Sequence, residues 1–208
     1  MSKNAYIRLL KFFSRRWRRV YERLCGRFVV HYIHIGKNAG TTIKSTLHEI
    51  NKTKNRRYFF NVYHSHGFKF SDIPYGDLFF FSIRDPVKRF YSGFYSRKRM
   101  GMPRLYNPHS RGEKKAFLNF ADANALAEAL SSSDGNLKYA AVAAMTDIRH
   151  VCSSHWDWFD NCDVFADPRL VGILSQDQLD EDMRVMLSRL GLDCQCRLPS
   201  DPVSSHKN

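Results

Sequence analysis

Residues 28–42 have the sequence FVVHYIHIGKNAGTT, in which an apolar run ends abruptly in a loop of small residues. The run is rich in β-branched and aromatic residues and stops at Gly36, so it predicts a buried strand. Beyond the loop, Ile43, Leu47 and Ile50 recur at helical spacing, after hydroxyl residues that can cap a helix. We therefore expect a strand, a tight loop and a helix in that order.

The loop, HIGKNAGTT over residues 34–42, is the sharpest functional signal in the sequence. Small residues let backbone N–H groups approach a phosphate closely, and the N-terminus of the following helix favours an anion. Lys37, Thr41 and Thr42 add side-chain donors. Ordinary nucleotide triphosphatases place the lysine, and a Mg²⁺-binding Ser or Thr, after the second glycine instead of before it. The loop thus predicts an anionic ligand other than Mg-ATP; the alternative is a strand-to-helix turn with a chance lysine.

Further apolar runs complete the expected fold. Strands are predicted over residues 58–63, 78–83 and 171–174, and unbroken apolarity is typical of parallel strands covered on both faces. Helical spacing and a proline suited to a first turn predict helices over 86–99, 117–130, 137–148 and 179–190. These elements predict an α/β domain with a mostly parallel central sheet and a helical second half.

A second motif, SIRDPVKRFYSGF over residues 82–94, begins where the strand over 78–83 ends. Arg84 leaves the sheet at the carboxyl end of its strand, where open α/β sheets bind ligands. Ser92 lies two turns along the following helix, and a guanidinium with a hydroxyl can hold one phosphate. Asp85 is expected to cap the helix, and Arg89 to be a structural or surface charge.

In this order, about 47 residues apart and each after a strand, the two motifs resemble those of sulfotransferases that use 3′-phosphoadenylyl sulfate (PAPS), in particular the membrane-associated carbohydrate type. The resemblance covers residues 28–100 and implies a P-loop-like three-layer domain that requires no metal. It implies that the 5′-phosphosulfate is held by Lys37, Asn38, Ala39, Gly40, Thr41 and Thr42, and the 3′-phosphate by Arg84 and Ser92. Gly36 departs from the Pro usual in relatives, and Asn38 from a common Thr or Ser.

The sequence His64-Ser-His66-Gly follows the second predicted strand. Imidazole has a pKa near neutrality, which suits a base that removes a proton from an acceptor hydroxyl. The pair resembles the His-x-His of some glycan sulfotransferases, which implies His66 as the base, His64 as a second candidate and Lys37 as the group that stabilises the leaving phosphate. The alternative is that both histidines only form ordinary hydrogen bonds. His31 and His34, within the first strand run, are interpreted as structural.

Charge is distributed unevenly along the 208 residues, whose formal net charge is +13. Residues 1–115 carry 26 Lys or Arg against 6 Asp or Glu, whereas residues 116–208 carry 7 against 14. The basic half predicts a polyanionic partner such as a phosphorylated small molecule, an acidic glycan, nucleic acid or an anionic membrane. The basic stretch after the second motif is by default a solvated face, and beside a transfer site it could hold an anionic acceptor; it comprises Arg97, Lys98, Arg99, Arg104, Arg111, Lys114 and Lys115.

The first 27 residues alternate cations with large apolar residues and predict a basic amphipathic helix that precedes the domain over 28–208. Such a helix can lie on an anionic membrane or recruit an acidic partner, and a solvated helix packed on the domain is the alternative. No apolar run reaches the roughly 18 to 20 residues of a membrane span, and a secretory signal is not evident. We expect a cytoplasmic protein, soluble or peripheral on the inner face of the membrane.

Together the motifs predict a sulfotransferase that moves a sulfuryl group from PAPS to a hydroxyl of a glycan or glycolipid, with no nucleic acid as partner. A P-loop kinase is a second interpretation, against which the absent GK[ST] sequence counts. A non-catalytic basic protein that binds membrane or nucleic acid is a third. The five cysteines form no CxxC pair, so free thiols are expected.

Overall fold

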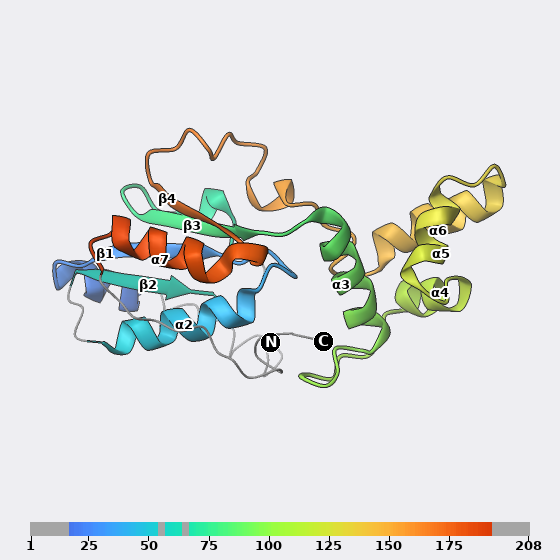
Figure 1. Cartoon of the computed structure of the whole chain (residues 1–208), viewed down its shortest axis with the longest axis horizontal. Helices are drawn as coiled ribbons and strands as arrows, with labels where there is room; N and C mark the ends of the chain where they lie inside the picture. The colour runs from blue at the N-terminus through green and yellow to red at the C-terminus, as the bar shows by residue number, and fades with distance from the viewer. Residues whose placement is uncertain (1–16, 54–56, 64–66, 193–208) are drawn as a thin grey trace.

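The computed structural model describes residues 17–53, 57–63 and 67–192. At its centre lies a four-stranded sheet in the order β2-β1-β3-β4, in which all neighbouring strands are parallel (Figure 1). The strands are β1 (Phe28–Ile33), β2 (Tyr58–Val62), β3 (Leu78–Ile83) and β4 (Leu170–Ser175). The prediction of an α/β domain with a parallel sheet is confirmed, and each strand lies within two residues of its predicted bounds.

Helices α2 (Gly40–Lys52) and α7 (Leu179–Arg189) cover one face of the sheet. Alternate residues of β1 point to opposite faces, so Val30 and Tyr32 meet these helices. The apolar residues of α2 recur at helical spacing and lie in this core, namely Ile43, Leu47 and Ile50. Burial of this stripe holds α2 against the sheet, with its first turn following the carboxyl end of β1.

The opposite face is covered by a helix over residues 17–24, deep blue in Figure 1, and by largely irregular segments. The segments include the short 3₁₀ turns η1 (Phe70–Asp72) and η2 (Trp156–Trp158). Ile33, Phe79 and Phe81 form the core on this side together with residues of both segments. Cover on both faces is consistent with a three-layer α/β arrangement.

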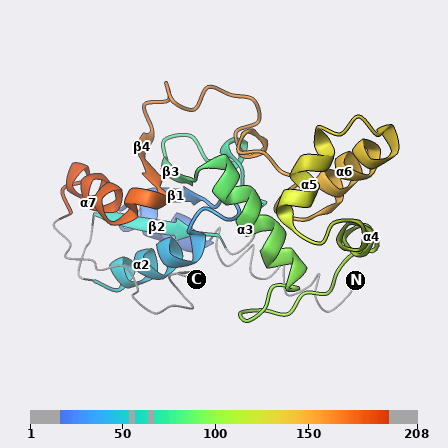
Figure 2. The ribbon, with the colours of Figure 1, turned by 45° about the vertical axis from the view of Figure 1, so that its right-hand side comes forward.

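The second half of the chain is mainly helical, as predicted, and its helices form a group beside the sheet. Figure 2 shows α3 leading from the sheet toward this group. The helices are α3 (Pro86–Lys98), α4 (Arg111–Asn119), α5 (Ala123–Leu130) and α6 (Gly135–Asp147). A core of its own, formed by Phe94 of α3 with Phe120, Leu126 and Ile148, holds the group together.

A single helix over 117–130 is wrong, because α4 ends at Asn119 and α5 begins at Ala123. The chain is extended at Phe120, which is buried in the helical core. Asp122 then caps α5 by accepting a hydrogen bond from the backbone N–H of Ala125 at 2.9 Å. Asp122 therefore starts a new helix, although the apolar spacing continues past it.

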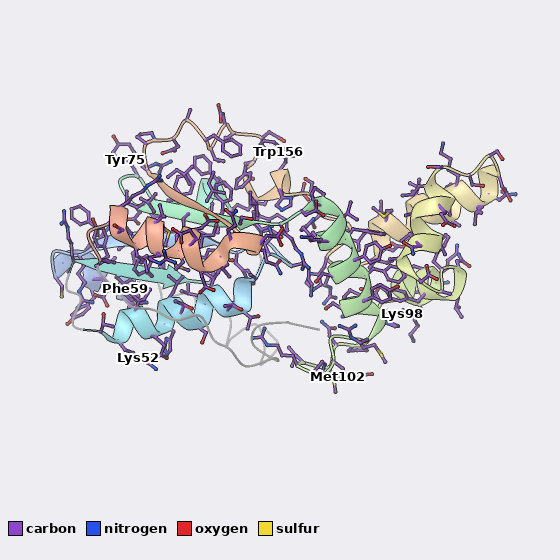
Figure 3. All side chains as sticks on the ribbon, in the orientation of Figure 1. Lys52, Phe59, Tyr75, Lys98, Met102 and Trp156 are labelled. Atoms are coloured by element: carbon purple, nitrogen blue, oxygen red, sulfur yellow. The ribbon has the colours of Figure 1, made fainter. Side chains whose placement is uncertain are left out.

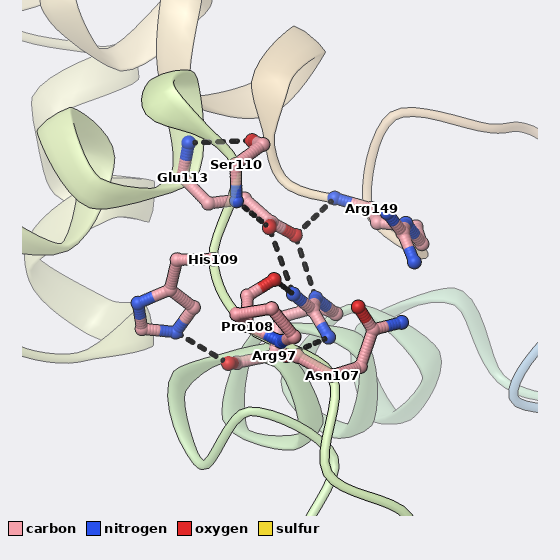
Figure 4. A network of polar contacts seen from close by, with 7 residues as sticks. All are labelled: Arg97, Asn107, Pro108, His109, Ser110, Glu113 and Arg149. Carbon is pink, nitrogen blue, oxygen red and sulfur yellow. Dashed lines mark hydrogen bonds and ion pairs between the residues drawn. The ribbon is translucent and has the colours of Figure 1, made fainter.

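The prediction of a solvated basic face is wrong for Arg97, because this side chain is buried. Figure 4 shows its guanidinium donating two hydrogen bonds to the carboxylate of Glu113, at 2.6 and 2.8 Å. The backbone N–H groups of Ser110 and Arg149 donate to the same carboxylate. Burial raises the pKa of Glu113, but these hydrogen bonds outweigh burial and lower it to about 2.

Within the described residues, no helix is long and apolar enough to cross a bilayer.

Candidate functional site

The loop over residues 34–40 lies where β1 ends and α2 begins, beside the carboxyl end of β3. The φ angles of Lys37 (71°) and Ala39 (57°) are both left-handed, whereas that of Asn38 between them is not. Backbone of alternating hand turns successive N–H groups toward one concave side, which is a common anion-binding shape. The structure thus gives the predicted loop a backbone suited to an anion.

A buried polar network supports the loop from beneath. The side-chain amide of Asn38 donates to the carbonyl of Ser82 at 2.8 Å, and the hydroxyl of Ser82 donates to the carbonyl of Asn38 at 2.7 Å. The same amide nitrogen lies 2.9 Å from Nε2 of His155. Asn38 is fully buried, and its side chain fixes the loop on β3.

The first residue of α2, Gly40, must lack a side chain, because the ring of His34 lies against it. A Cβ atom at this position would lie 2.0 Å from Nε2 of His34, which is buried. The residue before α2, Ala39, supplies no side-chain cap, and the first turn holds no acidic residue. The first turn of α2 therefore has neither a side-chain cap from Ala39 nor a carboxylate, and a helix N-terminus of this kind favours an anion.

Cations gather around this helix N-terminus. The pKa of Lys37 is lowered to about 8 by burial and then by the neighbouring charges of Arg84, Arg99 and Arg104. The pKa of Lys44, on the first turns of α2, is also lowered to about 8 by burial and by Arg104. Each charged side chain that shifts the pKa of Lys37 or Lys44 is an arginine. The cluster therefore has an excess of positive charge, which suits a polyanion.

Arg104 reaches the first turn of α2 from the segment after α3. Its guanidinium donates a hydrogen bond to the hydroxyl of Thr41. Among the described residues, Lys37, Lys44 and Arg104 have no carboxylate within salt-bridge distance. The positive charge of these three side chains is therefore not neutralised by the rest of the described chain.

Arg84 follows the last residue of β3 and points to the same loop. Its Nη1 donates to the carbonyl of Lys37 at 3.3 Å, and its buried Nε has no hydrogen-bond partner within the described part of the chain. Burial lowers the pKa of Arg84, whereas Asp177 and Asp85 oppose this effect. A half-buried guanidinium with a free donor is equipped to bind an anionic oxygen.

The remaining residues of the second motif lie on α3. Asp85 caps the helix by accepting from the backbone N–H of Lys88 at 2.8 Å, as predicted. Arg89 is buried and donates to the carbonyls of Gly36 and Ser153, which confirms a structural role. Ser92 is half-buried about 9 Å along the helix axis from Pro86. Arg84 is hydrogen-bonded to the loop and not to Ser92, so the two are not joined in the free protein.

The histidines divide into two groups. His64 and His66, the predicted bases, lie outside the described residues. His31 and His34 are buried, as expected of structural residues. The ring nitrogens of His31 lie 2.9 Å from Oδ2 of Asp77 and 3.0 Å from the hydroxyl of Tyr63, and burial lowers its pKa.

Lys44, and His155 behind the loop, belong to the site without having been predicted. Lys44 could have been found from its place one turn into α2, but no pattern links His155 to a loop 117 residues away. Within the described ranges, no group of three or more His, Cys, Asp or Glu is placed to hold a metal ion. Comparisons of the chain with protein-family models, with curated proteins and with solved structures found no match.

Proposed function

We propose that this chain is a sulfotransferase that uses PAPS, with a P-loop-like domain. The proposal rests on the cation cluster around the first turn of α2, in which the charges of Arg84, Arg99 and Arg104 act on Lys37 and that of Arg104 also acts on Lys44. PAPS carries a 5′-phosphosulfate and a 3′-phosphate, so it needs two anion sites near one sheet edge. The loop over 34–40 and Arg84 follow neighbouring strands and are joined by a hydrogen bond, which supports two anion sites at this edge.

The described residues fit the two halves of this donor. The uncapped first turn of α2 and the alternating backbone at 37–39 offer N–H groups to the phosphosulfate. The Nε of Arg84, which has no partner in the described part of the chain, would hold the 3′-phosphate together with Ser92 on α3. A bound 3′-phosphate would give that buried nitrogen an acceptor.

Lys37 has the chemistry of a group that assists transfer. In the reaction the acceptor oxygen forms a bond to sulfur while the bond from sulfur to the bridging phosphate oxygen breaks, which leaves negative charge on that oxygen. A partly buried ammonium aimed at this oxygen stabilises the charge more strongly than it would in water. The acceptor proton would pass to His66 or His64, and the acceptor would be a hydroxyl of a glycan or glycolipid.

Calorimetric titration with adenosine 3′,5′-bisphosphate, ATP and GTP tests the donor class. We expect submicromolar to micromolar binding of the bisphosphate without Mg²⁺, and much weaker binding of both triphosphates. Lys37→Ala should weaken bisphosphate binding about 10-fold or more, since it removes a charged partner. Lys52→Ala is the matched control, because Lys52 lies at the other end of α2 (Figure 3) and pairs with Glu49.

Two outcomes would replace the proposal with the alternatives raised by the sequence. Tight, Mg²⁺-dependent binding of ATP in preference to the bisphosphate would indicate a kinase. Equal, weak binding of all three nucleotides that Lys37→Ala leaves unchanged would indicate a basic protein without a nucleotide site.

A further inference from the structure

The helix over residues 17–24 exposes its apolar side chains to solvent. Trp17, Tyr21 and Leu24 are 70%, 63% and 82% exposed, and Val20 between them is also exposed. Spacings of three and four residues place all four on one helix face, which we call the aromatic stripe. A contiguous exposed stripe of this kind marks an interaction surface more often than a single exposed apolar residue does.

The opposite face of this helix fastens it to the sheet. Arg23 donates to the carboxylate of Asp77 with its Nε at 3.0 Å, and the guanidinium of Arg18 lies 4.9 Å from the ring centre of Phe59. Glu22 is buried and accepts a hydrogen bond from Arg27 at 2.8 Å. These contacts fix the rotation of the helix about its axis, so that the aromatic stripe is held outward.

Charge decides what can cover the aromatic stripe. The first 27 residues contain nine Lys or Arg and a single acidic residue, Glu22, which is already paired with Arg27. A second copy of the chain docked on the stripe would bring two such basic segments together, and their repulsion opposes that contact. A surface of negative charge would instead be attracted by the same cations.

We propose that the aromatic stripe seats this protein on an anionic lipid bilayer. The helix would lie in the plane of the interface, with Trp17, Tyr21 and Leu24 among the lipid headgroups and upper acyl chains. Tryptophan and tyrosine favour that depth because each combines an apolar ring with a polar group. A short amphipathic helix flanked by cations binds such a surface without crossing it. This inference concerns placement of the protein and does not depend on the proposed reaction.

The test uses the full chain and sedimentation with vesicles of phosphatidylcholine containing about 30% phosphatidylserine, a composition with a negative surface potential. The variant Trp17→Ser, Tyr21→Ser, Leu24→Ser should bind these vesicles about 10- to 100-fold more weakly than the unaltered protein. A matched control replaces the same residue types at exposed positions elsewhere, Trp156→Ser, Tyr139→Ser and Leu118→Ser, and should bind normally. Trp156, labelled in Figure 3, lies in η2, away from this helix.

A second measurement does not depend on the fold of any multiple variant. Brominated lipids should quench the fluorescence of Trp17 in the unaltered protein, and Trp17→Phe should lose that quenched component. Unchanged vesicle binding by the stripe variant, or no quenching at Trp17, would overturn the proposal. So would equal binding to pure phosphatidylcholine vesicles, or a dimer in sizing chromatography that the stripe variant abolishes. Bisphosphate affinity measured alongside reports on the proposed function separately.

Discussion

At the scale of single residues, substitution of Arg84 distinguishes binding of the 3′-phosphate from binding of the 5′-phosphosulfate of the proposed donor. The buried Nε of Arg84 has no hydrogen-bond partner among the described residues and would bind the proposed 3′-phosphate. Arg84→Ala should weaken adenosine 3′,5′-bisphosphate binding by about 2 to 4 kcal/mol, or about 30- to 1000-fold, because a charged hydrogen-bond partner is lost. Binding of adenosine 5′-phosphosulfate, which lacks the 3′-phosphate, should change far less. Calorimetry on both ligands checks this, and an equal loss for both would contradict the assignment.

Lys37 should make the proposed nucleotide binding depend on pH. Its pKa in the free protein is about 8, and a bound anion would raise that pKa by favouring the ammonium. Affinity should therefore be highest below pH 8 and should fall as the pH rises through 8, with proton uptake on binding in that range. Calorimetry of the bisphosphate in buffers of different ionisation enthalpy measures the uptake.

Lys37→Arg provides the check on this assignment, because guanidinium stays charged throughout the range. The variant should take up fewer protons at pH 8 to 9, and the control Lys52→Arg should behave as the unaltered protein. Uptake that persists in Lys37→Arg would assign the proton to Lys44, whose pKa is also lowered to about 8.

Local sequence was enough to predict the loop and Arg84, because both follow strands directly and the edge of a parallel sheet brings such positions together. Two other contacts could not be predicted. Arg104 reaches Thr41 across 63 residues, and His155 reaches Asn38 across 117. Both depend on how the helical group sits against the sheet, which neither periodicity nor composition encodes.

At the scale of elements, the junction of β1 and α2 leaves no room for a side chain at Gly40, because the ring of His34 lies against this residue. Gly40→Ala should destabilise the protein by about 1 to 3 kcal/mol, because the added Cβ would overlap the ring of His34. The cost should be smaller in a His34→Ala background, where that ring is absent. Urea denaturation of the two single variants and the double variant measures this coupling. A cost that is the same in both backgrounds would show that the ring is not the obstacle.

Strands and helices were predicted correctly where a single sequence pattern, such as an unbroken apolar run, marks the element. The strands are unbroken apolar runs, and β3 has the predicted bounds of 78–83. The break between α4 and α5 was missed because Phe120, a core residue in extended backbone, continues the apolar spacing across it. Tertiary packing of that side chain, together with the cap at Asp122, outweighs the periodicity.

At the scale of the whole molecule, a buried ion pair joins α3 to α4 within the helical group. Arg97 of α3 holds Glu113 of α4, and its remaining donors reach the carbonyls of Asn107 and Pro108. These bonds close the segment between the two helices, which is also the segment that carries Arg104 to the loop. The fold thus uses one guanidinium to fix both the helical group and one cation of the proposed site.

Glu113→Gln should destabilise the protein at pH 7 by about 3 to 5 kcal/mol, because it leaves the buried charge of Arg97 without its partner. The pKa of Glu113 is about 2 in the folded chain and 4.5 as its ordinary value. A lowered pKa means that the stabilisation is complete above pH 4.5 and is lost as the pH falls from 4.5 toward 2. The variant and the unaltered protein should therefore differ in urea denaturation at pH 7 and converge near pH 2. Glu181→Gln, which alters an exposed pair with Arg184, should leave stability within about 0.5 kcal/mol; a Glu113→Gln protein as stable as this control at pH 7 would show that the helical group is held by its apolar core alone.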